Sequence, residues 1–211
     1  MVYQVKEIYF TLQGEGAQAG RAAVFLRFAG CNLWTGLERD RARAICQFCD
    51  TDFVGMDGVG GGKFGSAGDL AGAVAREWPK DAGGKPLAVC TGGEPALQLD
   101  EALIGALHEA GFEIAVESNG TIALPGGLDW ICVSPKADTD LAQRSGDELK
   151  LVYPQQGVDP ARFEGLAFRH FFLQPMDGPS REENTGLAAR YCLSHPRWRL
   201  SLQSHKLIGI P

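Results

Sequence analysis

The sequence lacks the features that mark membrane, secreted and nucleic-acid-binding proteins. No apolar run approaches the roughly 20 residues that a membrane-spanning helix needs, and residues 1–6 do not open a signal peptide. Basic residues do not dominate, since the formal net charge is −6, whereas a protein that holds nucleic-acid phosphates needs a basic face. We therefore expect a cytoplasmic protein that acts on a small polar molecule, with neither a membrane nor a nucleic acid as partner.

A complete set of four neighbouring cysteines is also missing. Cys31, Cys46 and Cys49 form a C-x14-C-x2-C array directly after the apolar run 22–29, and no fourth cysteine lies nearby. Structural zinc is almost always closed and four-coordinate, and a redox pair made of Cys46 and Cys49 leaves Cys31 unexplained. Iron-sulfur clusters are usually held by four thiolates, so three thiolates leave one iron open to a substrate or cofactor. The array favours a 4Fe-4S cluster.

Short apolar runs alternate with helical patterns along the chain, which is typical of successive β-α-β units and a parallel sheet. With 211 residues and 45% hydrophobic content, one domain over residues 1–211 is expected. A closed (β/α)8 barrel takes about 250 residues, so the pattern predicts an α/β fold with an open, partial parallel barrel of about six strands and reduced helical cover.

The expected elements follow from these runs and from the turn residues between them. Parallel strands are predicted at 22–28, 87–90, 112–116, 130–133, 149–153 and 170–173. An added strand at 3–12 lies in an N-terminal extension, 1–20, and a last extended run covers 198–203. Helices are predicted at 66–78, 99–110 and 182–193. Seven of the fourteen residues from Gly55 to Gly68 are glycine, which predicts an irregular surface loop.

Polar residues follow the carboxyl ends of the predicted strands, where parallel α/β proteins assemble their sites. We expect one cavity lined by five segments: 31–51, 91–95, 117–120, 134–136 and 174–177. Arg27 lies inside an apolar strand, where a charge needs a partner. Its planar guanidinium suits a substrate carboxylate, and a structural ion pair with an unidentified acid is the alternative.

The cysteine array together with Gly92-Gly93-Glu94-Pro95 resembles the radical S-adenosylmethionine (SAM) superfamily. Alone, the second motif is typical of an ordinary turn. The resemblance implies that Cys31, Cys46 and Cys49 hold a 4Fe-4S cluster whose open iron binds the amino and carboxylate groups of SAM. It also implies that Gly92, Gly93 and Glu94 contact the methionyl amino group.

The residues 32–45 inserted between the first two cysteines depart from the usual superfamily spacing and predict a small extra structure in the cluster-binding loop, 31–49. This enlarged loop, the opening 12–16, the triplet 134–136 and the ending 204–211 resemble the 7-carboxy-7-deazaguanine synthase family over essentially the whole chain. The resemblance implies a carbon-nitrogen lyase that converts 6-carboxy-5,6,7,8-tetrahydropterin to 7-carboxy-7-deazaguanine with loss of ammonia, in queuosine biosynthesis. It also implies magnesium, a flavodoxin-type reductant and a homodimer.

The same resemblance assigns binding residues, each of which has a plainer explanation because strand ends are often polar. For SAM these are Phe48, Asp50, Gly92, Gly93, Glu94, Glu117, Ser118, Asn119, Ser134, Lys136, Gln174, Pro175, Met176 and Asp177. For the pterin they are Leu12, Gln13, Gly14, Glu15, Arg27, Thr91, His205 and Pro211, the last two from a C-terminal tail, 198–211, that closes on the substrate. Thr51 would bind Mg²⁺ through oxygen. Without the resemblance, Glu15 and Lys136 would be solvated charges.

Two other hypotheses stay open. Another small radical SAM enzyme, such as a glycyl-radical activase, would share the cluster but bind a protein instead of a pterin. A non-enzymatic zinc-binding module would use the cysteines alone, although it leaves the polar strand ends without a role.

Overall fold

The computed structural model describes residues 2–211, and its centre is one nine-stranded sheet with the order β3-β1-β2-β4-β5-β6-β7-β8-β9. From β2 to β9 neighbouring strands are parallel: β2 (Ala22–Phe28), β4 (Leu87–Gly92), β5 (Glu113–Ser118), β6 (Trp130–Val133), β7 (Ser145–Tyr153), β8 (Ala167–Pro175) and β9 (Trp198–Leu200). At the other edge, β1 (Tyr3–Leu12) pairs antiparallel with β2, and β3 (Gly62–Phe64) pairs antiparallel with β1. Within the described residues β3 and β9 form the two edges, so the sheet stays open.

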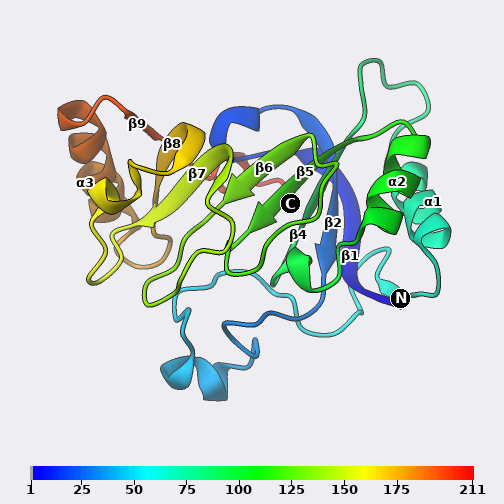
Figure 1. Ribbon diagram of the computed structural model, residues 1–211, viewed down its shortest axis with the longest axis horizontal. Coiled ribbons are helices and arrows are strands. Elements are labelled where there is room, and N and C mark those ends of the chain that lie inside the picture. The colour runs from blue at the N-terminus through cyan, green and yellow to red at the C-terminus, as the bar shows by residue number, and fades with distance from the viewer. Residues whose placement is uncertain (1) are drawn as a thin grey trace.

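Helices cover only parts of this sheet. Helices α1 (Ala67–Glu77) and α2 (Glu101–Glu109) lie together at one end, and α3 (Arg181–Ser194) lies at the other (Figure 1). Residues 119–144, which connect β5 to β6 and β6 to β7, contain no α-helix. The remaining helical segments are short: η1 (Gly16–Gln18), η2 (Glu38–Arg43), η3 (Pro95–Leu97), η4 (Pro160–Phe163) and α4 (Ser204–Ile208). No helix among residues 2–211 combines the length and the apolar character that a membrane crossing requires.

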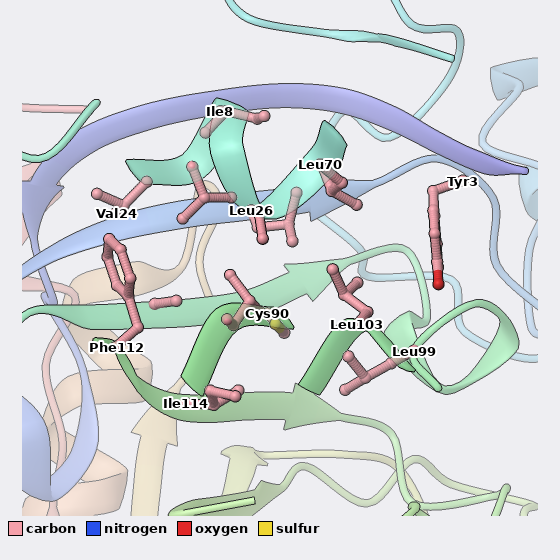
Figure 2. Packing of buried hydrophobic residues seen from close by; sticks show 14 of the residues in the cluster. Tyr3, Ile8, Val24, Leu26, Leu70, Cys90, Leu99, Leu103, Phe112 and Ile114 are labelled. Carbon is pink, nitrogen blue, oxygen red and sulfur yellow. The ribbon is translucent and has the colours of Figure 1, made fainter. Parts of the chain in front are cut away.

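The outer face of the sheet forms the main hydrophobic core because every second strand residue points to it. Leu26 of β2 packs there with Leu70 of α1 and Leu103 of α2 (Figure 2). All three side chains have no exposed surface, so truncating any one of them to alanine should cost about 2–5 kcal/mol. A second cluster, around Phe171 and Trp198, packs α3 against the other half of the sheet.

The inner face carries the alternate residues of the same strands. Near the amino ends of the strands it is apolar, with Ala23, Leu87, Val89 and Ala115 in one small cluster. Toward the carboxyl ends it becomes polar. The period of two brings the following residues to this face: Arg27 of β2, Thr91 of β4, Glu117 of β5, and Glu148 and Lys150 of β7. The pairing register sets Arg27 beside Thr91. The sheet therefore has an apolar floor and a polar upper rim.

The open parallel α/β fold with sparse helices, predicted from the sequence, is confirmed, with one parallel strand more than the expected six. The prediction of an irregular loop over the glycine-rich residues 55–68 is wrong in part, because the segment contains β3 and the start of α1. Glycine permits the edge pairing: a Cβ added to Gly61 would lie 2.2 Å from the carbonyl oxygen of Lys6 in β1. The tail also differs from expectation, since the run 198–203 is a strand only as far as Leu200 and is followed by α4.

Candidate active site

A cavity of about 380 Å³ opens at the carboxyl ends of the parallel strands, within the size range of small-molecule sites. Every predicted site residue lines it except Gly14, Cys31 and Glu94. The loop after β1, the cluster-binding loop, the ends of β4 to β8 and the C-terminal tail all contribute. Residues that the sequence analysis missed line it as well: Lys6, Glu7, Tyr9, Phe25, Asp52, Lys150, Val152, Gln203 and Lys206.

The three predicted cluster cysteines are free thiols that lie close enough to affect one another's ionisation. Cys46 and Cys49 line the cavity, while Cys31 lies beside Gly93. Burial raises the pKa values of Cys31 and Cys46, and the nearby Lys136 ammonium partly offsets this for Cys46. A positively charged metal centre would favour the thiolate forms in the same way. Two sulfur donors at the cavity wall and a third beside Gly93 fit an iron-sulfur cluster with one open position.

The segment inserted into the cluster-binding loop braces the second and third cysteines. It contains η2, which is the small extra structure predicted for residues 32–45. From η2, Arg41 donates hydrogen bonds to the backbone carbonyls of Gln47 (2.9 Å) and Cys49 (3.1 Å). Its guanidinium also lies 4.1 Å from the ring centroid of Trp34. The insertion thus holds the backbone of the Cys46–Cys49 segment in place through Arg41.

Two glycines let the end of β4 approach the cluster-binding loop. Gly92 has a φ of +139°, and a Cβ there would lie 2.3 Å from the carbonyl oxygen of Phe28. A Cβ on Gly93 would lie 2.1 Å from the carbonyl oxygen of Gly30 and 2.8 Å from the Cβ of Cys31. Larger side chains would push the strand end and the cysteine apart. Both glycines line the cavity with their backbone.

The Glu94 carboxylate turns away from the cavity and ties β4 to β5. It is completely buried and accepts hydrogen bonds from the Ser118 hydroxyl (2.8 Å) and from the backbone amides of Asn119 (2.7 Å) and Ala96 (2.9 Å). Burial raises its pKa, which these donors partly offset. A contact between Glu94 and SAM stays a prediction. Because the carboxylate is already bonded within the protein, the backbone of Glu94 would have to make that contact.

The other predicted SAM residues also line the cavity, and Glu117 among them belongs to the network around Lys150. Lys136 donates to the carbonyl (2.8 Å) and hydroxyl (2.7 Å) oxygens of Ser134 and lies 5.8 Å from the ring centroid of Phe48, so it is not simply a solvated cation. The Asn119 amide donates to Asn32 of the cluster-binding loop (2.9 Å). Residues 174–177 line the cavity as well, and Gln174 accepts a hydrogen bond from the Ser201 hydroxyl (3.2 Å).

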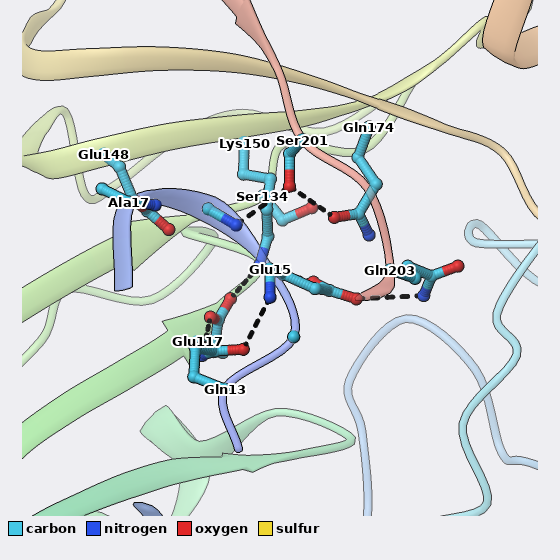
Figure 3. Close-up of polar contacts among 12 residues, drawn as sticks. Gln13, Glu15, Ala17, Glu117, Ser134, Glu148, Lys150, Gln174, Ser201 and Gln203 are labelled. Atoms are coloured by element: carbon cyan, nitrogen blue, oxygen red, sulfur yellow. Dashed lines mark hydrogen bonds and ion pairs between the residues drawn. The ribbon is translucent and has the colours of Figure 1, made fainter. Parts of the chain in front are cut away.

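Lys150 is the centre of a charged network on another wall of the cavity (Figure 3). Its Nζ lies 2.6 Å from Oε2 of Glu15 and 2.8 Å from Oε2 of Glu117. Gln13 donates to the second oxygen of Glu117 (3.1 Å), and Gln203 donates to the second oxygen of Glu15 (3.0 Å). Glu15 is therefore an anchored carboxylate and not a solvated one. The signal that could have revealed Lys150 is the one used for Arg27, a charge inside an apolar strand.

The network keeps its charges because opposite charges outweigh burial. Burial alone raises the pKa of Glu15, but Lys150 and Gln203 lower it to about 2. Burial likewise disfavours the Lys150 ammonium, and the surrounding acids hold its pKa well above the usual value. For Glu148, whose carboxylate accepts a bond from the Ala17 amide (2.8 Å), burial prevails and the pKa is raised. Ligand atoms of Glu117, Cys132 and Glu148 lie within 4.8 Å of one another, and Lys150 supplies positive charge to this group.

Arg27 has an acid partner inside the protein. Its Nε lies 2.7 Å from Oε1 of Glu7, and one of its terminal nitrogens donates to the Tyr9 hydroxyl (2.8 Å). Both partners come from β1 and line the cavity. The structural ion pair considered from the sequence therefore has an identified acid, and binding of a substrate carboxylate by Arg27 stays a prediction. No sequence signal set Glu7 apart from the other acidic residues.

The C-terminal tail returns to the cavity. Ser204 donates its backbone amide to the carbonyl of Gly14 (3.0 Å), and a Cβ on Gly14 would lie 2.1 Å from Nδ1 of His205. Burial lowers the pKa of His205. The Thr11 hydroxyl donates to the main-chain oxygen of Pro211 (2.9 Å), so the end of the tail lines the cavity beside β1.

A second lysine, Lys206, links two carboxylates at the rim of the cavity. Lys206 of α4 contacts Asp50, the residue directly after the cluster-binding loop (2.5 Å), and Asp177 after β8 (2.6 Å). Thr51, the predicted magnesium ligand, follows Asp50 and lines the cavity. The two predicted SAM residues Asp50 and Asp177 thus already share one internal cation.

An open parallel barrel with Cys46 and Cys49 in the cavity at its strand ends, and with Cys31 beside the glycines that end β4, defines a radical SAM type of enzyme. Comparisons with known proteins narrow this class. The chain is 64% identical over 214 residues to the 7-carboxy-7-deazaguanine synthase of Caulobacter vibrioides and 63% identical over 211 residues to that of Bordetella pertussis, and each match covers 100% of both chains. The chain belongs to the 7-carboxy-7-deazaguanine synthase family, which confirms the resemblance found in the sequence.

A solved structure shares the fold. The crystal structure of QueE from Escherichia coli aligns with a TM-score of 0.68 over 96% of this chain and 94% of that chain, at 24% sequence identity. At this identity the likeness concerns the fold alone. No family model matches the chain.

Proposed function

We propose that this protein converts 6-carboxy-5,6,7,8-tetrahydropterin to 7-carboxy-7-deazaguanine with loss of ammonia, as a carbon-nitrogen lyase in the biosynthesis of queuosine and related deazapurines. One observation carries the proposal: Cys46 and Cys49 line the same cavity as the polar wall of Gln13, Glu15 and Glu117. A cofactor held by the cysteines and a pterin held by the wall would share one enclosed space. Membership of the family supports the same product.

The cysteines would hold a 4Fe-4S cluster, and the Gly92–Gly93 backbone, Ser134 and Lys136 would hold SAM beside it. When bound, the cluster and SAM supply the abstraction of a hydrogen atom that starts the ring contraction. The glycines let this strand end lie close to β2 and the cluster-binding loop, because any Cβ there would lie within 2.3 Å of a backbone oxygen. Lys136, already ordered by Ser134, offers positive charge to a carboxylate.

The polar wall would bind the pterin. An amino-pyrimidinone edge presents neighbouring N–H donors and a carbonyl acceptor, which match carboxylate and amide groups such as those of Glu15, Glu117 and Gln13. The resemblance assigned Glu117 to SAM, and we reassign it to the pterin because it shares Lys150 with Glu15. Arg27 would add charge attraction for the substrate carboxylate. The tail, with His205 and Pro211, would shield the reacting carbon from water and other hydrogen donors.

Further parts of the proposal concern partners. Thr51 would give one oxygen ligand to Mg²⁺, with waters and substrate oxygens completing the shell. A low-potential cluster needs an outside reductant of the flavodoxin type. We also propose a homodimer, testable by light scattering, and a cytoplasmic location, where the six free thiols stay reduced.

The experiment is anaerobic reconstitution with iron and sulfide, followed by turnover of the carboxylated tetrahydropterin with SAM, Mg²⁺ and dithionite, read by product mass. Cys46→Ala should lose both the cluster and turnover. The matched control is Cys192→Ala, since Cys192 lies in α3 and does not line the cavity, and it should keep both. Stoichiometric zinc without iron would favour a zinc-binding module. Formation of 5'-deoxyadenosine only with an added polypeptide would favour a glycyl-radical activase.

A further inference from the structure

Lys150 is a buried ammonium between two carboxylates that line the cavity. We propose that Lys150 is a positioning residue that keeps Glu15 and Glu117 ionised and aligned, and so makes this wall an acceptor surface that selects ligands with adjacent N–H donors. This inference rests on the proposed function, because the donor edge in question is the amino-pyrimidinone of the pterin. It adds a residue that acts on recognition through the two acids.

The geometry leaves each carboxylate little freedom to turn. Glu15 is held by Lys150 on one oxygen and by Gln203 on the other, and Glu117 is held by Lys150 on one oxygen and by Gln13 on the other. A carboxylate oxygen can accept two hydrogen bonds, so each acid keeps acceptor capacity after these contacts. Both acids are cavity residues with 18% of the side chain exposed, whereas Lys150 has 3% exposed. Lys150 therefore fixes the positions of the two carboxylates, and the carboxylates offer their free acceptor sites to a ligand in the cavity.

The charges around Lys150 decide which ligand edge suits the wall. Titratable groups face it from the following elements: Glu15 from the loop after β1, Glu117 from β5, Cys132 from β6, Glu148 from β7 and, next to Glu15, His205 from α4. The single Lys150 ammonium does not neutralise all of these acids. The wall therefore keeps hydrogen-bond acceptors and repels anions. A ligand with one carboxylate and one N–H-rich edge would therefore turn that edge toward this wall.

Loss of the ammonium would change the chemistry of the wall and not only its stability. Two neighbouring, mostly buried carboxylates without a cation do not both stay ionised near neutral pH, because like charges raise one pKa. One acid would then carry a proton and face the substrate as a donor. The protonated carboxyl would then face the N–H donors of the pterin, and pterin binding would weaken. A higher pH would remove that proton and restore binding.

The test measures KM for the pterin and for SAM in the reconstituted enzyme between about pH 6.5 and 9, over which a carboxyl with a raised pKa loses its proton. Lys150→Met should raise the pterin KM by about tenfold or more near neutral pH, since hydrogen bonds to two charged acceptors are affected. The difference in pterin KM between Lys150→Met and wild type should shrink as the pH rises, and the KM for SAM should stay unchanged. Lys150→Arg should restore much of the lost affinity. Lys85→Met is the matched control, because it also removes an ammonium that pairs with an acid, Glu113, but Lys85 does not line the cavity, and it should leave both KM values unchanged.

Glu15→Gln tests the same idea if Lys150→Met does not fold, because Lys150 then keeps Glu117 as its partner. It should raise the pterin KM and spare that of SAM. The positioning role is overturned if the tested variant keeps a pterin KM within about twofold of wild type, or raises both KM values equally at every pH. A wild-type enzyme that turns over no pterin would instead reject the proposed function.

Discussion

Two lysines in this protein each bridge two carboxylates, yet they lie in different surroundings. Lys150, on the inner wall, joins Glu15 to Glu117 and has 3% of its side chain exposed. Lys206, at the rim, joins Asp50 to Asp177 and has 27% exposed. The chemistry of the two bridges is the same, and the depth of burial separates their roles.

Burial makes the inner bridge a fixed part of the fold. Removing one partner from a buried ion pair leaves charge without compensation, and this costs far more than losing a pair at the surface. The rim bridge is partly solvated and open to salt, so it can break and reform at small cost. We therefore expect Lys150 to hold the binding wall rigid and Lys206 to hold the tail in a closure that can open.

The largest expected effect is on stability at the inner bridge. Lys150→Met should lower the free energy of unfolding by about 3–5 kcal/mol, because Glu15 and Glu117 lose their common cation. Urea unfolding monitored by circular dichroism measures this. The control is Lys85→Met, whose exposed ammonium pairs with Glu113 and whose loss should change stability by about 0.5 kcal/mol or less. A smaller loss for Lys150→Met than for Lys206→Met would reverse the comparison.

Acid titration sharpens the comparison at Glu15. The pKa of Glu15 is lowered from 4.5 to about 2, so its ion pair stabilises the fold above pH 4.5 and this contribution disappears as the pH falls toward 2. The shift corresponds to roughly 3 kcal/mol at most. Unfolding of wild type and Glu15→Gln across this range should show a stability gap that closes on acidification. A stability difference between wild type and Glu15→Gln that stays constant below pH 4.5 would show that the ion pair with Lys150 does not lower the pKa of Glu15.

At the rim, Lys206→Met should cost about 1 kcal/mol or less in the free energy of unfolding. Its main effect should be local: backbone amides of residues 204–210 should exchange hydrogen faster, because α4 loses its ion pairs with Asp50 and Asp177. Hydrogen exchange followed by mass spectrometry measures this. Amides of β7 serve as the internal control. Equal acceleration in β7 and in the tail would mean that the rim bridge supports the whole fold.

Salt should produce the smallest effect and separate the two bridges once more. Raising the ionic strength from about 0.1 M to about 1 M shortens the Debye length from about 10 Å to about 3 Å. The stability gap between wild type and Lys206→Met should then shrink by a few tenths of a kcal/mol. The gap for Lys150→Met should stay the same, since bulk ions do not reach its Nζ. A strong salt dependence of the Lys150→Met gap would contradict its burial.

The fold and the presence of Cys46 and Cys49 at the cavity were largely predictable because both follow from local patterns. Strand and helix positions follow from apolar runs and turn residues, and Cys46 and Cys49 lie three positions apart in one loop. Strand β3 was missed because its pairing depends on close approach of the Gly60–Gly62 backbone to β1, which glycine content alone does not reveal. The helix α4 was missed because its five residues are too few to show a period.

The parallel α/β class, the spacing of the three cysteines and the family resemblance can all be read from the amino-acid sequence, since periodicity and spacing are properties of consecutive residues. Which charges neutralise one another depends on the tertiary fold. Gln203 and Glu15 are 188 positions apart, and nothing local tells that they meet beside Lys150. Arg27 pairs with Glu7 and not with another acid because the antiparallel register of β1 and β2 sets those two residues side by side. Such pairings depend on strand order and register, which the whole chain sets together.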